Sequence, residues 1–219
     1  MAALAGEHGI TYDARGLVEP DDSVPDVAEV SGTTAVFDAK DLTTRKINLV
    51  LRQLVYERGI KDVTIKNPGA KHSLGTGILT RCKITFEGSL GYFGATMIDG
   101  PEVHITGRVG WSACQNMMSG VVVIEGNAGS LTGAALRGGD MVIKGRVGAR
   151  TGIDQKGGLI VTMGSAGSMT GFMMQRGRQI ICGDAGHGLG NPPEFEKFVC
   201  GKRLYNYDNL EPSERKLVL

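Results

Sequence analysis

The sequence predicts a mainly β fold, a single-stranded right-handed parallel β-helix with an N-terminal capping helix. We expect about 19 residues per coil and six to seven coils. Three observations lead to this prediction. Glycine makes up 34 of the 219 residues, about twice its usual share of roughly 7%. These glycines recur at one fixed spacing, and short β-branched runs recur between them. Such self-similarity is typical of solenoid proteins.

The glycines recur with a 19-residue period that does not slip. A second series of glycines follows the first by three positions, and a third follows the second by four. We expect these three series to be the structural glycines of the coils: Gly88, Gly107, Gly126, Gly145, Gly164 and Gly183; Gly91, Gly110, Gly129, Gly148, Gly167 and Gly186; Gly133, Gly152, Gly171 and Gly190. A fourth series comprises Gly120, Gly139, Gly158 and Gly177. Gly69 extends the first series backwards, so the repeat begins near Val63.

Short strands are predicted between the glycines. Six apolar, mostly β-branched runs each end two positions before a first-series glycine, at 84–86, 103–105, 122–124, 141–143, 160–162 and 179–181. One such unit cannot bury its apolar face alone, so coils must stack in register about 4.8 Å apart. Glycine suits the corners, where positive φ or close stacking excludes a side chain. Left-handed helices built on hexapeptide repeats prefer coil lengths that are multiples of six, so a 19-residue coil favours the right-handed form.

The flanking segments are expected to cover the ends of the stack. Residues 18–26 are predicted to form an extended arm, 34–37 a short strand and 41–58 a helix over the first coil. The helix has Asp41 or Thr43 as candidate N-cap, Gly59 as its stop, and an apolar stripe of Ile47, Val50, Leu51, Leu54 and Val55. The break at 191–193 ends the repeat. The resulting division is 1–58 for the arm and capping helix, 59–201 for the β-helix and 202–219 for the tail.

Composition excludes several classes of function. The 24 basic and 23 acidic residues leave a net charge of +1, which does not favour nucleic-acid binding. No apolar run approaches the roughly 20 residues of a membrane-spanning helix, and residues 1–10 lack a signal-peptide pattern. The four cysteines, Cys82, Cys114, Cys182 and Cys200, form no CxxC pair and fit reduced thiols in a cytoplasmic protein.

No set of residues with catalytic spacing stands out, so we predict no catalytic, cofactor-binding or metal-binding residue in this chain. Each glycine cluster leads to another strand, whereas a phosphate loop leads to a helix. His8, His72, His104 and His187 have no carboxylate or nucleophile at a recognisable spacing. Met117 and Met174 occupy equivalent coil positions beside Met118 and Met173. Both core filling and a partner-binding face remain open for these methionines.

The repeat resembles a known family. The pattern G-xx-G-xxx-G at 126–133, 145–152 and 164–171 is similar to the GXGXG β-helix that forms the C-terminal domain of the glutamate synthase large subunit. It also resembles the C subunit of formylmethanofuran dehydrogenase. The resemblance covers about 63–190. A free-standing chain of this size with the segments at 116–120 and 183–186 is most similar to the small β-helix subunits of N-methylglutamate synthases.

This resemblance implies an assembly that converts methylamine and glutamate into N-methylglutamate and ammonia. It implies a hetero-oligomer with a glutamine-amidotransferase-like subunit and a synthase-like subunit that carries FMN and an iron–sulfur cluster. The β-helix chain would itself hold no cofactor, would scaffold both partners and would line the ammonia route. Two alternatives remain. One is a subunit of a formylmethanofuran dehydrogenase or formyltransferase/hydrolase complex; the other is an independent carbohydrate-active enzyme.

The sequence weighs against the carbohydrate-active alternative. Such enzymes need clustered carboxylates, and the strand column Glu87, Thr106, Glu125, Lys144 and Met163 is mixed in character. The first coils also depart from the family pattern. Pro101 stands where the fourth series predicts glycine, and Ala95 and Cys114 stand in the third series.

Overall fold

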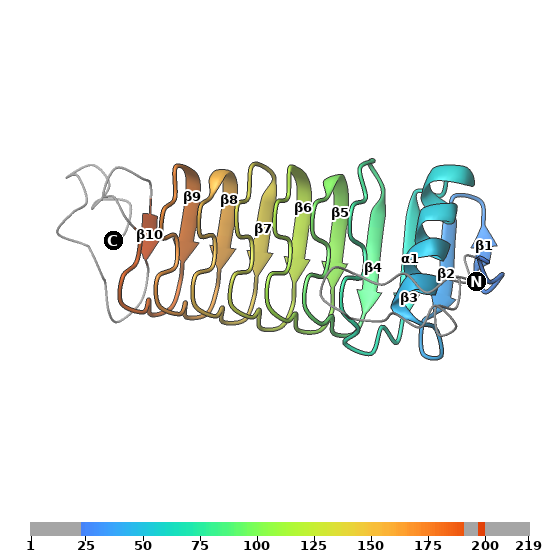
Figure 1. Cartoon of the computed structure of the whole chain (residues 1–219), viewed down its shortest axis with the longest axis horizontal. Helices are drawn as coiled ribbons and strands as arrows, with labels where there is room; N and C mark the ends of the chain where they lie inside the picture. The colour runs from blue at the N-terminus through green and yellow to red at the C-terminus, as the bar shows by residue number, and fades with distance from the viewer. Residues whose placement is uncertain (1–22, 191–196, 200–219) are drawn as a thin grey trace, which may run out of the picture.

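The chain forms a long parallel β-solenoid in a computed structural model that describes residues 23–190 and 197–199 (Figure 1). Ten strands lie in one sheet, in the order in which they occur along the chain. They are β1 Glu29–Ser31, β2 Thr34–Asp38, β3 Asp62–Lys66, β4 Lys83–Glu87, β5 Asp99–Ile105, β6 Ser119–Ile124, β7 Asp140–Ile143, β8 Lys156–Thr162, β9 Arg176–Ile181 and β10 Lys197–Val199. The described helices are α1 Thr44–Arg52 and the π-helical turn η2 Gln53–Glu57.

The strand register follows the glycine spacing. Val103 of β5 pairs with Val122 of β6, and Val122 pairs with Met141 of β7, so each coil from β4 to β9 advances the chain by one 19-residue period. The coil before them is longer, because Val63 pairs with Ile84. All neighbouring pairs from β2 to β10 are parallel, and β1 pairs antiparallel with β2. The predicted parallel β-helix is therefore confirmed. The right-handed sense of the coil stays a prediction.

The core is a set of apolar columns that run along the solenoid axis. Two columns come from alternate strand residues, with Phe86, Ile105, Ile124 and Ile143 in one and Ile84, Val103, Val122, Met141 and Ile160 in the other, all buried. A third column pairs from coil to coil through isolated parallel bridges, and valine alternates with alanine in its middle coils; it runs through Leu90, Val109, Ala128, Val147, Ala166 and Ala185. Alternating large and small side chains lets neighbouring coils pack without voids.

Each coil has a corner, at residues 93–97 and their equivalents, in which every second residue has left-handed backbone. Phe93, Ala95 and Met97 have φ values of +58°, +51° and +53°, and the pattern repeats in later coils. The Phe93 N–H donates to Trp111 O in the next coil at 2.9 Å, whereas the Ala95 N–H donates to Leu74 O in the preceding coil at 2.8 Å. Left-handed backbone costs a non-glycine residue roughly 1–2 kcal/mol. Hydrogen bonds in both directions hold it in place.

The glycine series differ in why they need glycine. In the third series, Gly133 has φ of +66°, and the earlier coils place Ala95 and Cys114 in the same left-handed conformation. Gly148 of the second series instead lies against the preceding coil, because a Cβ there would sit 2.5 Å from Ser130 N. In the fourth series the register shifts between Asp99 and Glu102, so that Gly100 and Pro101 together lie opposite Gly120. Gly100, with φ of +100°, supplies the positive φ that a glycine of this series supplies in later coils.

At the N-terminal end, the predicted helix is present and connects β2 to β3 (Figure 1). Thr43, rather than Asp41, caps it, since Thr43 Oγ1 accepts a hydrogen bond from the Lys46 N–H. Its predicted apolar stripe is fully buried: Ile47, Val50, Leu51, Leu54 and Val55. Gly59 follows the helix with φ of +66°. None of the helices in the described part of the chain is long and apolar enough to cross a membrane.

Helix α1 and the first two strands cover different parts of the first coil. Asn48 bonds the corner backbone, with Nδ2 donating to Ser73 O and Oδ1 accepting from the Gly75 N–H, both at 2.9 Å. Arg52 donates to Thr76 O at 2.9 Å. The helix thus covers the corner of the coil, as expected. The edge of the sheet is covered instead by β2 and β1.

The C-terminal flank adds one strand beyond the predicted break. Phe198 of β10 pairs with Ile180 of β9, which is one position short of the coil period. Expectations for the arm at 18–22, the break at 191–193, Cys200 and the tail at 202–219 lie outside the described residues.

Candidate functional site

The outer face of the sheet carries a row of charged side chains. His104 Nε2 lies 2.8 Å from Glu125 Oε1, and Lys144 Nζ lies 2.7 Å from Glu125 Oε2. The prediction that no histidine has a carboxylate beside it is therefore wrong for His104. The separation along the chain is one coil plus two positions, which brings the pair onto the same face of neighbouring strands. A search of the sequence for oppositely charged residues separated by one coil period plus two positions would have found this pair.

This row is better suited to structure than to proton transfer. The hydrogen bond from Lys144 lowers the pKa of Glu125 most, and the hydrogen bond with His104 lowers it further. Both carboxylate oxygens are engaged, and the three side chains are between 31% and 48% exposed. A general base needs a free oxygen within reach of a substrate proton in a sheltered site. Neither condition is met here.

The remaining histidines and the cysteines form no reactive cluster among the described residues. His187 is exposed, and His8 lies outside the described part. Burial raises the pKa of Cys82 to about 11 and that of Cys114 to about 12, so both thiols stay protonated at neutral pH. Cys182 is exposed. Residues 23–190 contain no group of three or more His, Cys, Asp or Glu side chains that could hold a metal ion.

Two of the four methionines are buried and two are exposed. Met117 and Met174 are 0% and 1% exposed and fill the core. Met118 and Met173 are 45% and 56% exposed and lie on the surface. Core filling is therefore correct for the buried pair, and only the exposed pair is available to a partner.

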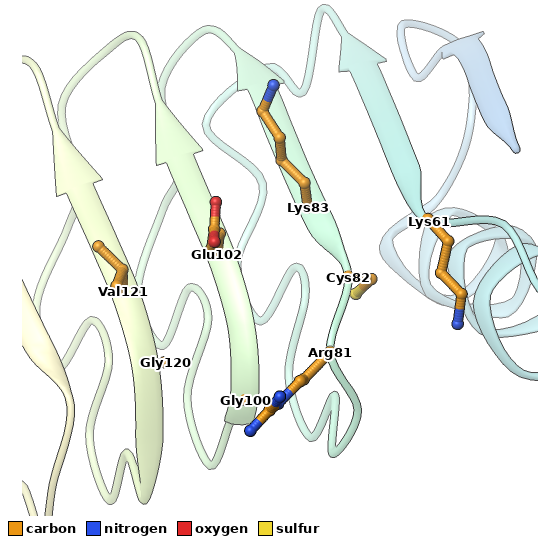
Figure 2. A pocket seen from close by; sticks show the side chains of 8 residues that line it. All are labelled: Lys61, Arg81, Cys82, Lys83, Gly100, Glu102, Gly120 and Val121. Carbon is orange, nitrogen blue, oxygen red and sulfur yellow. The ribbon is translucent and has the colours of Figure 1, made fainter.

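An open groove of about 440 Å³ crosses the starts of the strands from β3 to β6 (Figure 2). Lys61, Arg81 and Lys83 line it together with Glu102, and Gly100 and Gly120 leave part of its wall without side chains. Lys83 Nζ is paired with Asp62 Oδ2 at 3.4 Å. The groove is mildly cationic, and Cys82 at its side is a protonated, largely buried thiol.

A second groove of about 600 Å³ lies where the first coils leave the sheet. Its lining includes three cations, Lys40, Lys71 and Arg108, and one carboxylate, Glu87. Lys71 Nζ donates to the carbonyls of Ala39 and Lys40 at 3.1 and 3.3 Å, which holds its charge at the wall of the groove.

Beside this second groove, three rings from successive coils form a stack. The rings of His72 and Tyr92 are 4.6 Å apart and 9° from parallel, and those of Tyr92 and Trp111 are 5.6 Å apart and 24° from parallel. The Tyr92 N–H donates to His72 Nδ1 at 2.9 Å. Sequence reasoning did not find this stack. The signal was present, because Tyr92 and Trp111 are separated by one coil period.

The second-series glycines make room for the rings. A Cβ at Gly110 would lie 2.6 Å from Cδ1 of Tyr92, and a Cβ at Gly129 would lie 2.6 Å from Cδ1 of Trp111. The rings nevertheless remain open to solvent, with Tyr92 44% and Trp111 57% exposed. Neighbouring Phe93 is 47% exposed. Exposed aromatic side chains gathered in one place are typical of protein interfaces.

Comparison with curated proteins finds a bacterial relative. Over 91 residues the chain is 40% identical to Protein GlxC of Rhizobium meliloti (strain 1021). The matched segment is 41% of this chain and spans 39% of the length of GlxC. No protein-family model matches the chain, and no solved structure matches it.

Proposed function

We propose that this chain is a non-catalytic structural subunit of a glutamate-synthase-like enzyme assembly. The observation that carries the proposal is the parallel β-solenoid, whose 19-residue repeat resembles the β-helix of glutamate synthases. The similarity to GlxC supports it. The charged row around Glu125 also supports it, because both carboxylate oxygens are paired and the row is open to solvent, which fits a structural role.

The specific assembly that we propose is an N-methylglutamate synthase, which converts methylamine and glutamate into N-methylglutamate and ammonia. In it the chain holds a glutamine-amidotransferase-like subunit and a synthase-like subunit that carries FMN and an iron–sulfur cluster. Stacked coils about 4.8 Å apart form a stiff rod on the order of 30 Å long. A rod of this length separates two partners at a fixed distance and offers a wall for an ammonia route between them.

A subunit of a formylmethanofuran dehydrogenase or formyltransferase/hydrolase complex is the second candidate, because the same glycine repeat resembles that family. The two candidates differ in their partners. The first predicts a flavin and iron–sulfur protein, and the second predicts a metal–pterin protein or a formyltransferase.

Affinity purification of the tagged chain from its native host tests the proposal. We expect an amidotransferase-like chain and a yellow-brown flavin and iron–sulfur chain to co-elute, identified by mass spectrometry and an absorbance spectrum. The pool should then show methylamine-dependent formation of N-methylglutamate. Co-elution of a molybdenum or tungsten pterin protein would move the function to one-carbon transfer. A chain that recruits neither set would refute the scaffold role.

A further inference from the structure

The ring stack and the second groove form one continuous surface on the first coils. Lys71 directly precedes His72 in the chain, and Arg108 lies three positions before Trp111. The His72 ring packs against Gly91, and the Tyr92 ring packs against Gly110, which lies between Arg108 and Trp111 in the chain. We call the exposed side chains of this region the ladder surface: Lys40, His72, Tyr92, Phe93, Arg108 and Trp111.

Tyr92 presents its edge to solvent, because rings cover both of its faces. Tyr92 stacks between His72 and Trp111, and the Trp111 ring packs over Gly129 of the following coil. A nucleobase or another flat ligand needs a free ring face on which to stack. Ring edges carry partial positive charge, so this surface suits aliphatic side chains and carboxylates.

The charge of the groove favours an acidic partner. Three cations face a single carboxylate, Glu87. Asp38, whose oxygens accept hydrogen bonds from the Lys40 N–H and from Asn67 Nδ2, each at 2.8 Å, adds a second carboxylate beside Lys40. The cations still outnumber the carboxylates by three to two. Complementary charge across an interface accelerates association and selects the partner. Exposed aromatic side chains next to arginine supply the anchors that commonly dominate binding energy.

We propose that the ladder surface docks an acidic segment of a partner subunit, whose apolar side chains pack on Tyr92, Phe93 and Trp111 while its carboxylates pair with Lys40 and Arg108. This inference rests on the proposed function, since it names a subunit of that assembly as the occupant. The groove in Figure 2 lacks these features. One of its cations is already paired with Asp62, and its lining contains no aromatic side chain.

The chain has a single tryptophan, Trp111, which makes a direct reporter possible. We would label the full chain with 5-fluorotryptophan and record its one ¹⁹F resonance during titration with purified amidotransferase-like and synthase-like subunits of the same host. The resonance should shift with one of them. The affinity measured by calorimetry should fall as salt rises, because exposed charge pairs are screened.

A matched pair of double variants separates docking from general effects. Trp111→Ala with Arg108→Glu alters the ladder surface, and Met163→Ala with Arg137→Glu makes the same kinds of change at exposed positions of later coils. We expect the first pair to raise Kd by about 10-fold or more, as loss of an interface anchor does. The second pair should change Kd by less than about 2-fold, because surface changes outside an interface are close to neutral. Circular dichroism melting checks that both variants fold.

The outcomes separate this inference from the function on which it rests. Equal affinity of the ladder variant and wild type would overturn the docking site while leaving the scaffold role intact. If wild type binds neither subunit, both proposals fall. If deletion of residues 1–22 shifts the ¹⁹F resonance without any partner, this chain covers the surface itself, which also overturns the inference.

Discussion

The side-chain amide of Asn48 takes the place of a backbone peptide group in the hydrogen bonding of Gly75. Its Oδ1 accepts the Gly75 N–H at 2.9 Å, and its Nδ2 donates to the nearby Ser73 carbonyl at 2.9 Å. In later coils such corner groups bond to the preceding coil, as Gly133 N–H does with Ala113 O. Within the described chain, helix α1 takes the place of a preceding coil at this first corner. One amide, with a donor and an acceptor, supplies the hydrogen bonds that a coil would make.

Replacing Asn48 with leucine should therefore destabilise the N-terminal end. The Gly75 N–H would lose its side-chain partner in a part-buried place, and the Ser73 carbonyl would keep only the Thr76 hydroxyl as a donor. An unsatisfied buried group costs about 1–3 kcal/mol. Urea denaturation should show a lower free energy of unfolding. The control is Glu57→Gln, an exposed change in η2 that should leave stability within about 0.5 kcal/mol. Equal midpoints for N48L and wild type would refute this role.

Gly148→Val should destabilise the stack by more than the roughly 1 kcal/mol of an ordinary substitution. A Cβ at Gly148 would lie 2.5 Å from Ser130 N and 2.7 Å from Ser130 Oγ, and the backbone nitrogen cannot move aside without opening the coil. Circular dichroism melting measures the effect. Ala149→Ser, at the next residue, is the control and should melt close to wild type. A G148V variant that melts like wild type would show that the coils are not packed this closely.

A pair of buried glutamines should show strong energetic coupling. Gln155 and Gln179 are 0% and 2% exposed, and Gln179 Nε2 donates to Gln155 Oε1 at 3.0 Å. Either single change to methionine leaves the other amide short of a partner, at a cost of about 1–3 kcal/mol. The double variant should lose less than the sum of the singles, by about 0.5–3 kcal/mol. Urea denaturation of all four proteins gives the coupling.

The control for that cycle combines Gln179→Met with Cys82→Ala, which lies five strands away at the start of β4. Changes so far apart should add within about 0.5 kcal/mol. Additive losses for Gln155 and Gln179 themselves would show that the two amides do not share a hydrogen bond.

Glu125 should make stability depend on pH in the acid range. Its pKa is lowered from the ordinary value of 4.5 by hydrogen bonds from Lys144 and His104. A carboxyl group with a lowered folded pKa stabilises the protein above its unfolded pKa, and this stabilisation is lost as pH falls through the folded pKa. Glu125→Gln should therefore melt below wild type at pH 7, and the gap should close on acidification.

Melting curves of wild type and E125Q, recorded from neutral to strongly acidic pH, test this sign. Glu102→Gln, which removes an exposed carboxylate of β5, controls for the loss of one negative charge. A gap that stays constant or widens in acid would mean that the Glu125 bonds do not persist in solution.

The sequence predicted the repeat well because the solenoid is built from local units. Gly126, Gly145 and Gly164 recur at one spacing, and the apolar runs before them become β6, β7 and β8. It predicted the surface less well. The contact between His104 and Glu125 joins neighbouring coils with an offset of two positions, so a search for residues at the coil spacing passes over it.

The sequence by itself determined the coil length, the parallel register and the columns of the core, because each coil must repeat the turns and strands of the one before it. Only the tertiary structure decided how coils touch. A register shift sets Gly100 and Pro101 together opposite Gly120, Asn48 completes the first corner, and the rings from His72 to Trp111 gather beside a cationic groove. These features depend on side chains brought together by stacking, which is a three-dimensional property that no single coil encodes.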